Sequence, residues 1–174
     1  MLGPIFTIGH STHPWPEFLE ILQAHHVAAI ADVRQFPGSR RFPHFNAEAM
    51  AVELPTAGIG YLSFKNLGGR RKALVDSPNM GWRHPAFRGY ADFMQTPAFA
   101  LGIEALEIAA GKQATAIMCS EAVPWRCHRS LIGDAMLVRG WTVLDIFDER
   151  QVKPHLLTPF AVVSGLKIVY PLKP

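Results

Sequence analysis

Cysteine is scarce in this chain, which has only Cys119 and Cys127 among 174 residues. Two cysteines are too few for the disulfide framework of a small secreted protein, and in a reducing compartment they remain thiols or metal ligands. No apolar run approaches the roughly 20 residues of a membrane-spanning helix, and the first residues, Met1 to Pro4, lack the basic flank of a signal peptide. We therefore expect a cytoplasmic protein with no membrane partner.

Charge is also sparse, with 18% charged residues and a formal net charge of +3. So small an excess does not favour binding to an extended nucleic-acid duplex. Apolar residues make up 49% of the chain, which is enough to bury a core, and the length suits one domain. Since the chain shows no internal repeat, low-complexity tract or linker, we expect a single domain over residues 1–174.

Short apolar runs alternate with helical patterns along most of the chain. This alternation predicts an α/β fold, a single three-layer domain whose mostly parallel sheet is covered on both faces. The tail over residues 160–170 fits a hairpin that turns at Gly165 and could form a partner surface or a homodimer contact. Strands are expected at 4–9, 27–33, 59–62, 114–119 and 142–146, and helices near 15–22, 46–57, 97–111 and 127–139.

The segment from about residue 64 to 89 has no clean period. Its glycines, prolines and basic residues predict a long irregular loop, and such loops in compact domains are often functional. Within it, Gly68 and Gly69 permit close backbone approach and Arg70 offers a fork of donors suited to phosphate. A Gly-Gly turn with solvated charges is an equally good interpretation of the same residues.

Polar residues follow the ends of the expected strands. In an open parallel sheet, ligands bind in the crevice beyond the carboxyl ends of the strands, and right-handed crossovers bring the loops there to one edge. Taken singly, each such residue is more often a loop residue that faces water. The residues that the topology places together at this edge are His10, Ser11, Asp32, Arg34, Ser39, Arg40 and Glu121.

The densest chemistry lies between Cys119 and Arg129, where a strand is expected to end and a helix to begin near Cys127. The positive end of that helix beside His128 and Arg129 binds anions and lowers the pKa of a thiol, so Cys127 is the candidate thiolate. Cys119, at the end of an apolar strand, suits a buried structural role. Arg126 follows Cys119 by one position too many for a phosphatase loop, which argues against a phosphatase.

Seven ordered motifs resemble those of the domain-of-unknown-function family 488, and the resemblance covers nearly the whole chain. It implies a compact α/β domain with these motifs around one pocket, and it implies no particular reaction. The sequence departs from the family at Ala122 and Val123, where charged residues are usual. The motifs are TIGHST at 7–12, DVR at 32–34, PGSR at 37–40, LGGR at 67–70, GYADFM at 89–94, MCSE at 118–121 and CHR at 127–129.

The first functional hypothesis is an enzyme or binding protein for a phosphate-bearing ligand, a nucleotide or nucleic acid. Asp32 or Glu121 would be the general base and His10 or His128 its acid or base partner. Anion contacts would come from Arg34, Arg40, Arg70 and Arg129, with Ser11, Ser39, Gly68 and Gly69 completing the ligand site.

Two further hypotheses stay open. One is a Cys-dependent sulfur-transfer or redox enzyme in which Cys127 or Cys119 is the nucleophile. The other is a non-catalytic module that binds a partner through the terminal hairpin. Dinucleotide and nucleoside triphosphate motifs are absent, and no Cys or His spacing supports zinc, so we expect neither cofactor nor metal.

Overall fold

Strand β1 (Leu2–Gly9) lies inside a six-stranded sheet, paired in parallel with β4 (Thr115–Cys119) on one side and β5 (Trp141–Ile146) on the other. A computed structural model describes residues 2–174, so the first residue of the expected domain lies outside the described residues. The strand order is β3-β2-β4-β1-β5-β6, and only β6 is antiparallel to its neighbour. The remaining strands of the sheet are β2 (Ala29–Asp32), β3 (Gly60–Ser63) and β6 (Val152–Pro154).

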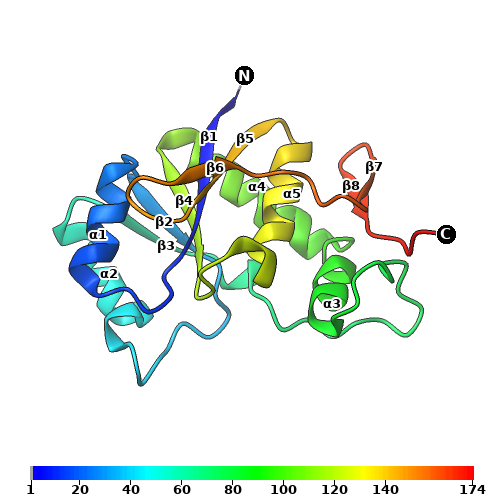
Figure 1. Cartoon of the computed structure of the whole chain (residues 1–174), viewed down its shortest axis with the longest axis horizontal. Helices are drawn as coiled ribbons and strands as arrows, with labels where there is room; N and C mark the ends of the chain where they lie inside the picture. The colour runs from blue at the N-terminus through cyan, green and yellow to red at the C-terminus, as the bar shows by residue number, and fades with distance from the viewer. Residues whose placement is uncertain (1) are drawn as a thin grey trace.

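Helices cover both faces of this sheet, so the predicted α/β class with its mostly parallel sheet is confirmed (Figure 1). Alternate residues of β1 show why, because Ile5 packs with one buried cluster and Phe6 and Ile8 pack with the other. Helices α1 and α2 supply the second cluster, and α4 and α5 supply much of the first. The bounds are α1 (Trp15–Ala24), α2 (Ala47–Thr56), α3 (Pro85–Phe93), α4 (Pro97–Lys112) and α5 (Arg129–Val138).

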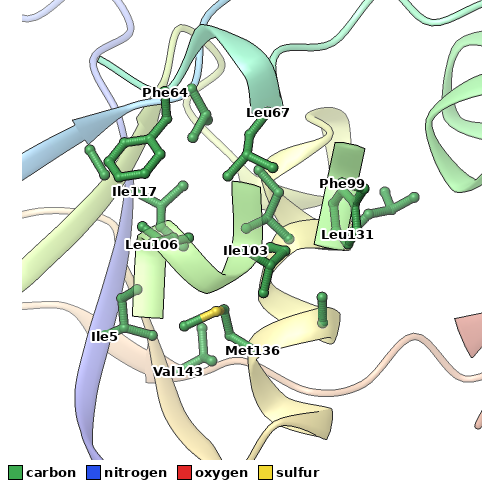
Figure 2. Close-up of a cluster of buried hydrophobic side chains, with 14 of the residues drawn as sticks. Ile5, Phe64, Leu67, Phe99, Ile103, Leu106, Ile117, Leu131, Met136 and Val143 are labelled. Carbon is green, nitrogen blue, oxygen red and sulfur yellow. The ribbon is translucent and has the colours of Figure 1, made fainter. Parts of the chain in front are cut away.

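Helix α4 illustrates how the sequence sets these elements. The Thr96 hydroxyl accepts a hydrogen bond from the Phe99 amide, and Pro97 occupies the first turn, where no amide hydrogen is needed. Its apolar face then meets β1, β4 and α5 in the larger cluster, where Ile103 and Leu106 pack beside Ile117 (Figure 2). This packing holds β4 in place beneath the loop that follows Cys119.

Two predicted boundaries were wrong, and one strand was not predicted. The irregular segment ends earlier than expected because α3 begins at Pro85, and α5 begins at Arg129 because Pro124–Arg126 forms a separate 3₁₀ turn. Strand β6 was not predicted, since it is a short exposed run. The terminal hairpin is confirmed as β7 (Val162–Ser164) and β8 (Lys167–Val169), which turn through Gly165 at a φ of 62°.

The carboxyl ends of β1, β2 and β4 meet at one edge of the sheet. In the β1–β4 register Gly9 lies opposite Cys119, and the His10 amide donates to the Cys119 carbonyl at 2.9 Å. On the other side of β4, the Val33 amide donates to the Met118 carbonyl at 3.1 Å. Three polar loops therefore begin side by side.

No helix within residues 2–174 has the length and hydropathy needed to cross a membrane.

Candidate functional site

A cavity of about 970 Å³ opens at this edge of the sheet. Its lining includes Cys119, at the end of β4. It also includes residues that were not predicted as site residues, such as Trp125 and Arg126. The sequence-predicted residues that the structure brings together in its lining are His10, Ser11, Arg34, Ser39, Gly69, Arg70, Glu121, Cys127 and His128.

Four other sequence-predicted residues do not line the cavity. Asp32 is buried behind Arg34, and Gly68 is buried with its α-carbon facing Gln35. Arg40 is exposed to solvent. Arg129 is fully buried, so the expectation that it reaches a ligand from the cavity wall does not agree with its position.

Asp32 and Arg34 form a buried bidentate ion pair. The Arg34 Nε and Nη2 atoms donate to the two carboxylate oxygens at 2.9 and 2.7 Å, and the Tyr61 hydroxyl donates to Asp32 at 2.6 Å. With its oxygens so occupied, Asp32 is poorly placed to serve as a general base. Arg34 keeps a cavity-facing guanidinium edge, because Nη1 donates one hydrogen bond, to His10, and carries two hydrogens.

His10 is held as a neutral imidazole. Burial lowers its pKa to about 4, more than the hydrogen bond to the Ser11 carbonyl raises it. That carbonyl accepts from Nδ1 at 2.9 Å, which leaves Nε2 to accept from Arg34 at 3.2 Å. The ring also stacks on Phe45 with centroids 4.2 Å apart. Both ring nitrogens are therefore engaged, and His10 orients Arg34.

The two cysteines lie at the floor of the cavity. Burial raises the pKa of Cys119, but the hydrogen bond from Cys127 and the Arg129 guanidinium outweigh it and bring the pKa down to about 7. Burial and the neighbouring Cys119 instead raise the pKa of Cys127 well above its usual value. This reverses the sequence-based interpretation, in which Cys127 was the candidate thiolate.

Arg129 reaches back from the first turn of α5 to the end of β4. Its Nη1 donates to Cys119 Sγ at 2.7 Å and to the Glu121 carbonyl, and its Nη2 donates to the Ala122 carbonyl at 3.3 Å. Its Nε donates to the Thr7 hydroxyl at 3.4 Å. The fully buried guanidinium thus joins β1, β4 and the loop above Cys119.

A buried polar chain continues from Thr7 to the C-terminal tail. The Thr7 hydroxyl donates to Asp145, whose other oxygen lies 3.0 Å from His155 Nδ1. His155 Nε2 lies 3.0 Å from Asp134, which also accepts from the Tyr170 hydroxyl at 2.8 Å. Burial lowers the pKa of His155, but the two carboxylates outweigh it and raise the pKa to about 9. His155 is therefore a cation between two anions, and no local sequence pattern predicts this network.

Glycines lie where the loops of the site approach one another closely. A Cβ atom on Gly9 would lie 1.6 Å from the Glu121 carbonyl oxygen, and one on Gly69 would lie 3.0 Å from His128 Nδ1. Two cavity residues that are not glycine, Ser11 and Arg70, have φ angles of 47° and 59°. Such left-handed backbone is uncommon outside glycine and is concentrated at functional sites.

The mouth of the cavity combines positive charge with exposed aromatic rings. Arg70 and Arg126 are exposed there, and Glu121 is the carboxylate in the lining. Phe36 and Trp125 are each 63% exposed, and the Arg70 guanidinium lies 5.0 Å from the centre of the Phe36 ring. Large exposed aromatic side chains beside uncompensated arginines are typical of surfaces that bind a ligand.

These features define an α/β protein with a cavity at the carboxyl edge of its sheet, lined by both charged and aromatic side chains, and with two thiols on the cavity floor. The chain belongs to the family described as Domain of unknown function DUF488, whose model matches residues 14–136. The expected family resemblance is thereby confirmed. His10 and the tail with His155 lie outside the matched residues. No curated protein and no solved structure matches the chain.

Proposed function

We propose that the cavity binds a small anionic ligand that carries a planar ring, a mononucleotide being the class that suits it best. The observation that carries this proposal is the pairing of Arg70 and Arg126 with the exposed rings of Phe36 and Trp125 around one opening. Arginine forks bind phosphate oxygens, and aromatic faces stack on nucleobases. The volume of about 970 Å³ lies within the range of small-molecule sites.

The charges around the cavity support an anion in particular. Asp32 balances Arg34, whereas Arg70 and Arg126 form no ion pair among the described residues. His10 is neutral because of its low pKa, and so is His128, whose burial lowers its pKa to about 4. Glu121 offsets one of these two arginines, so the mouth carries a net positive charge. A longer nucleic acid is a weaker candidate, because the net charge of the whole chain is only +3.

The test is binding of 5′-mononucleotides and inorganic phosphate to Arg70→Asn, measured by calorimetry and by thermal shift. Asparagine removes the guanidinium but tolerates the left-handed backbone at this position. We expect the variant to bind nucleotides about 10- to 100-fold more weakly than the unaltered protein, since a charge-assisted hydrogen bond contributes about 1.5–3 kcal/mol.

Arg40→Asn is the matched control, because Arg40 is an exposed arginine outside the cavity lining. It should bind as the unaltered protein does. If neither nucleotides nor phosphate raise the melting temperature of the unaltered protein, or if both variants lose affinity equally, the proposal is wrong. Partner binding through the β7–β8 hairpin stays a separate prediction.

A further inference from the structure

The cavity floor holds two thiols that differ in their surroundings. Cys119 ends β4 and is 2% exposed, and Cys127 precedes α5 and is 6% exposed, yet both line the cavity. The Arg129 side chain donates to Cys119 Sγ at 2.7 Å, whereas only the Arg129 backbone amide approaches Cys127 Sγ, at 3.5 Å. Each thiol also shifts the pKa of the other, downward for Cys119 and upward for Cys127, so the two sulfurs lie near each other. One sulfur is thus placed as an anion and the other as its proton-bearing neighbour.

His128 provides a second acceptor for the proton of Cys127. Its Nε2 lies 3.1 Å from the Val33 carbonyl, which can only accept, so Nε2 carries the ring hydrogen. The unprotonated Nδ1 then faces Cys127 Sγ at 3.6 Å. When Cys119 no longer carries negative charge, this nitrogen is the acceptor that remains beside the Cys127 thiol.

We propose that Cys119 and Cys127 form a dithiol–disulfide couple that exchanges with a small anionic disulfide bound in the cavity. The Cys119 thiolate attacks one sulfur of the substrate, the substrate S–S bond breaks, and one thiolate leaves. Cys127 then loses its proton through His128 and attacks Cys119 Sγ, which forms the Cys119–Cys127 disulfide and releases the second half of the substrate as a thiol. The protein loses two electrons and the one proton of Cys127, and the substrate disulfide leaves as one thiolate and one thiol, the thiol taking that proton from His128.

Arg129 acts as a positioning residue in this scheme. It favours the thiolate form of Cys119 before the first attack. It stays beside the two sulfurs after Cys119 has formed a disulfide bond and lost its negative charge. The preference for an anionic disulfide, through Arg70 and Arg126 at the mouth, rests on the proposed anion site. The exchange between the two cysteines does not depend on it.

The experiment uses two disulfide reagents on the reduced protein at pH 7. One is dithiobis(nitrobenzoate), which carries carboxylates, and the other is dithiodipyridine, which is neutral. With either reagent we expect the unaltered protein to release two thiol equivalents per chain and to retain no reagent by mass spectrometry. Cys127→Ser should release one equivalent and retain the other half as a mixed disulfide. Cys119→Ser should react about tenfold more slowly, because burial, the largest cause, still raises the pKa of the remaining Cys127 thiol.

Peptide mapping of the unaltered protein after brief alkylation gives the order of reactivity without any substitution, so the assignment does not depend on variants that fold. We expect Cys119 to be labelled first. Labelling of Cys127 first, or a stable mixed disulfide on the unaltered protein, would overturn the couple. If two equivalents are released but the carboxylate reagent reacts no faster than the neutral one, the dithiol couple stands and the anionic preference fails.

Discussion

Acidification from pH 7 to pH 4 is expected to remove about 6 kcal/mol of unfolding free energy through His10 and His128 alone. Burial holds the pKa of each at about 4, against 6.5 in an unfolded chain. A base whose pKa is lowered by folding binds a proton more readily in the unfolded chain. The contribution of the neutral imidazole to the free energy of unfolding is therefore complete above pH 6.5 and is lost as the pH falls toward 4. Each group therefore costs about 3 kcal/mol over this range. Urea unfolding at several pH values measures the loss.

The variants for this test preserve the hydrogen bonds that each imidazole donates. His10→Asn places an amide where Nδ1–H meets the Ser11 carbonyl, and His128→Gln places one where Nε2–H meets the Val33 carbonyl. The double variant should lose about 6 kcal/mol less than the unaltered protein between pH 7 and pH 4. The exposed His26 is the control position, because His26→Asn removes an imidazole without touching either of these hydrogen bonds. Parallel pH profiles for all proteins would show that His10 and His128 do not resist protonation.

The sequence was sufficient to predict the elements with strong apolar periodicity and the edge at which their loops meet. Helix α3 was not predicted, because Gly89 interrupts its helical pattern. The fold explains that glycine, since a Cβ atom there would lie 1.9 Å from the Arg71 carbonyl oxygen. Strand β6 was not predicted, because its three exposed residues show no alternation of buried and exposed side chains. Only their pairing with β5 makes them a strand. In both places, contacts distant in sequence override the local signal.

The roles of the two cysteines could not be predicted from local sequence. Cys127 was favoured because a helix was expected to begin there, but α5 begins two residues later and directs the Arg129 side chain back to Cys119. The contact between Arg129 and Cys119, which is one cause of the lowered pKa of Cys119, therefore spans ten residues and two elements. The His155 network could not be predicted for the same reason, because it joins Asp145 of a strand and Asp134 of a helix to the C-terminal tail.

Replacement of Arg129 by methionine is expected to lower the free energy of unfolding by about 4 kcal/mol and the melting temperature by about 10 °C. Methionine fills a similar volume, but it leaves the Glu121 and Ala122 carbonyls and the Cys119 sulfur without their donor. It also removes a positive charge that faces the buried Asp145 through Thr7. Urea unfolding at pH 7 measures the change, and alkylation rates against pH should show the pKa of Cys119 rising.

Arg139→Met separates this effect from the general loss of an arginine. Arg139 pairs with Glu107 at 2.9 Å, but both side chains reach solvent, so the substitution should cost less than about 1 kcal/mol. Arg129→Lys should fall between the two, because an ammonium group keeps the charge but cannot span β1, β4 and the loop above them. A methionine variant at position 129 as stable as the Arg139 control would mean that the guanidinium does not hold these elements together, and an unchanged alkylation profile would mean that it does not govern the Cys119 thiolate.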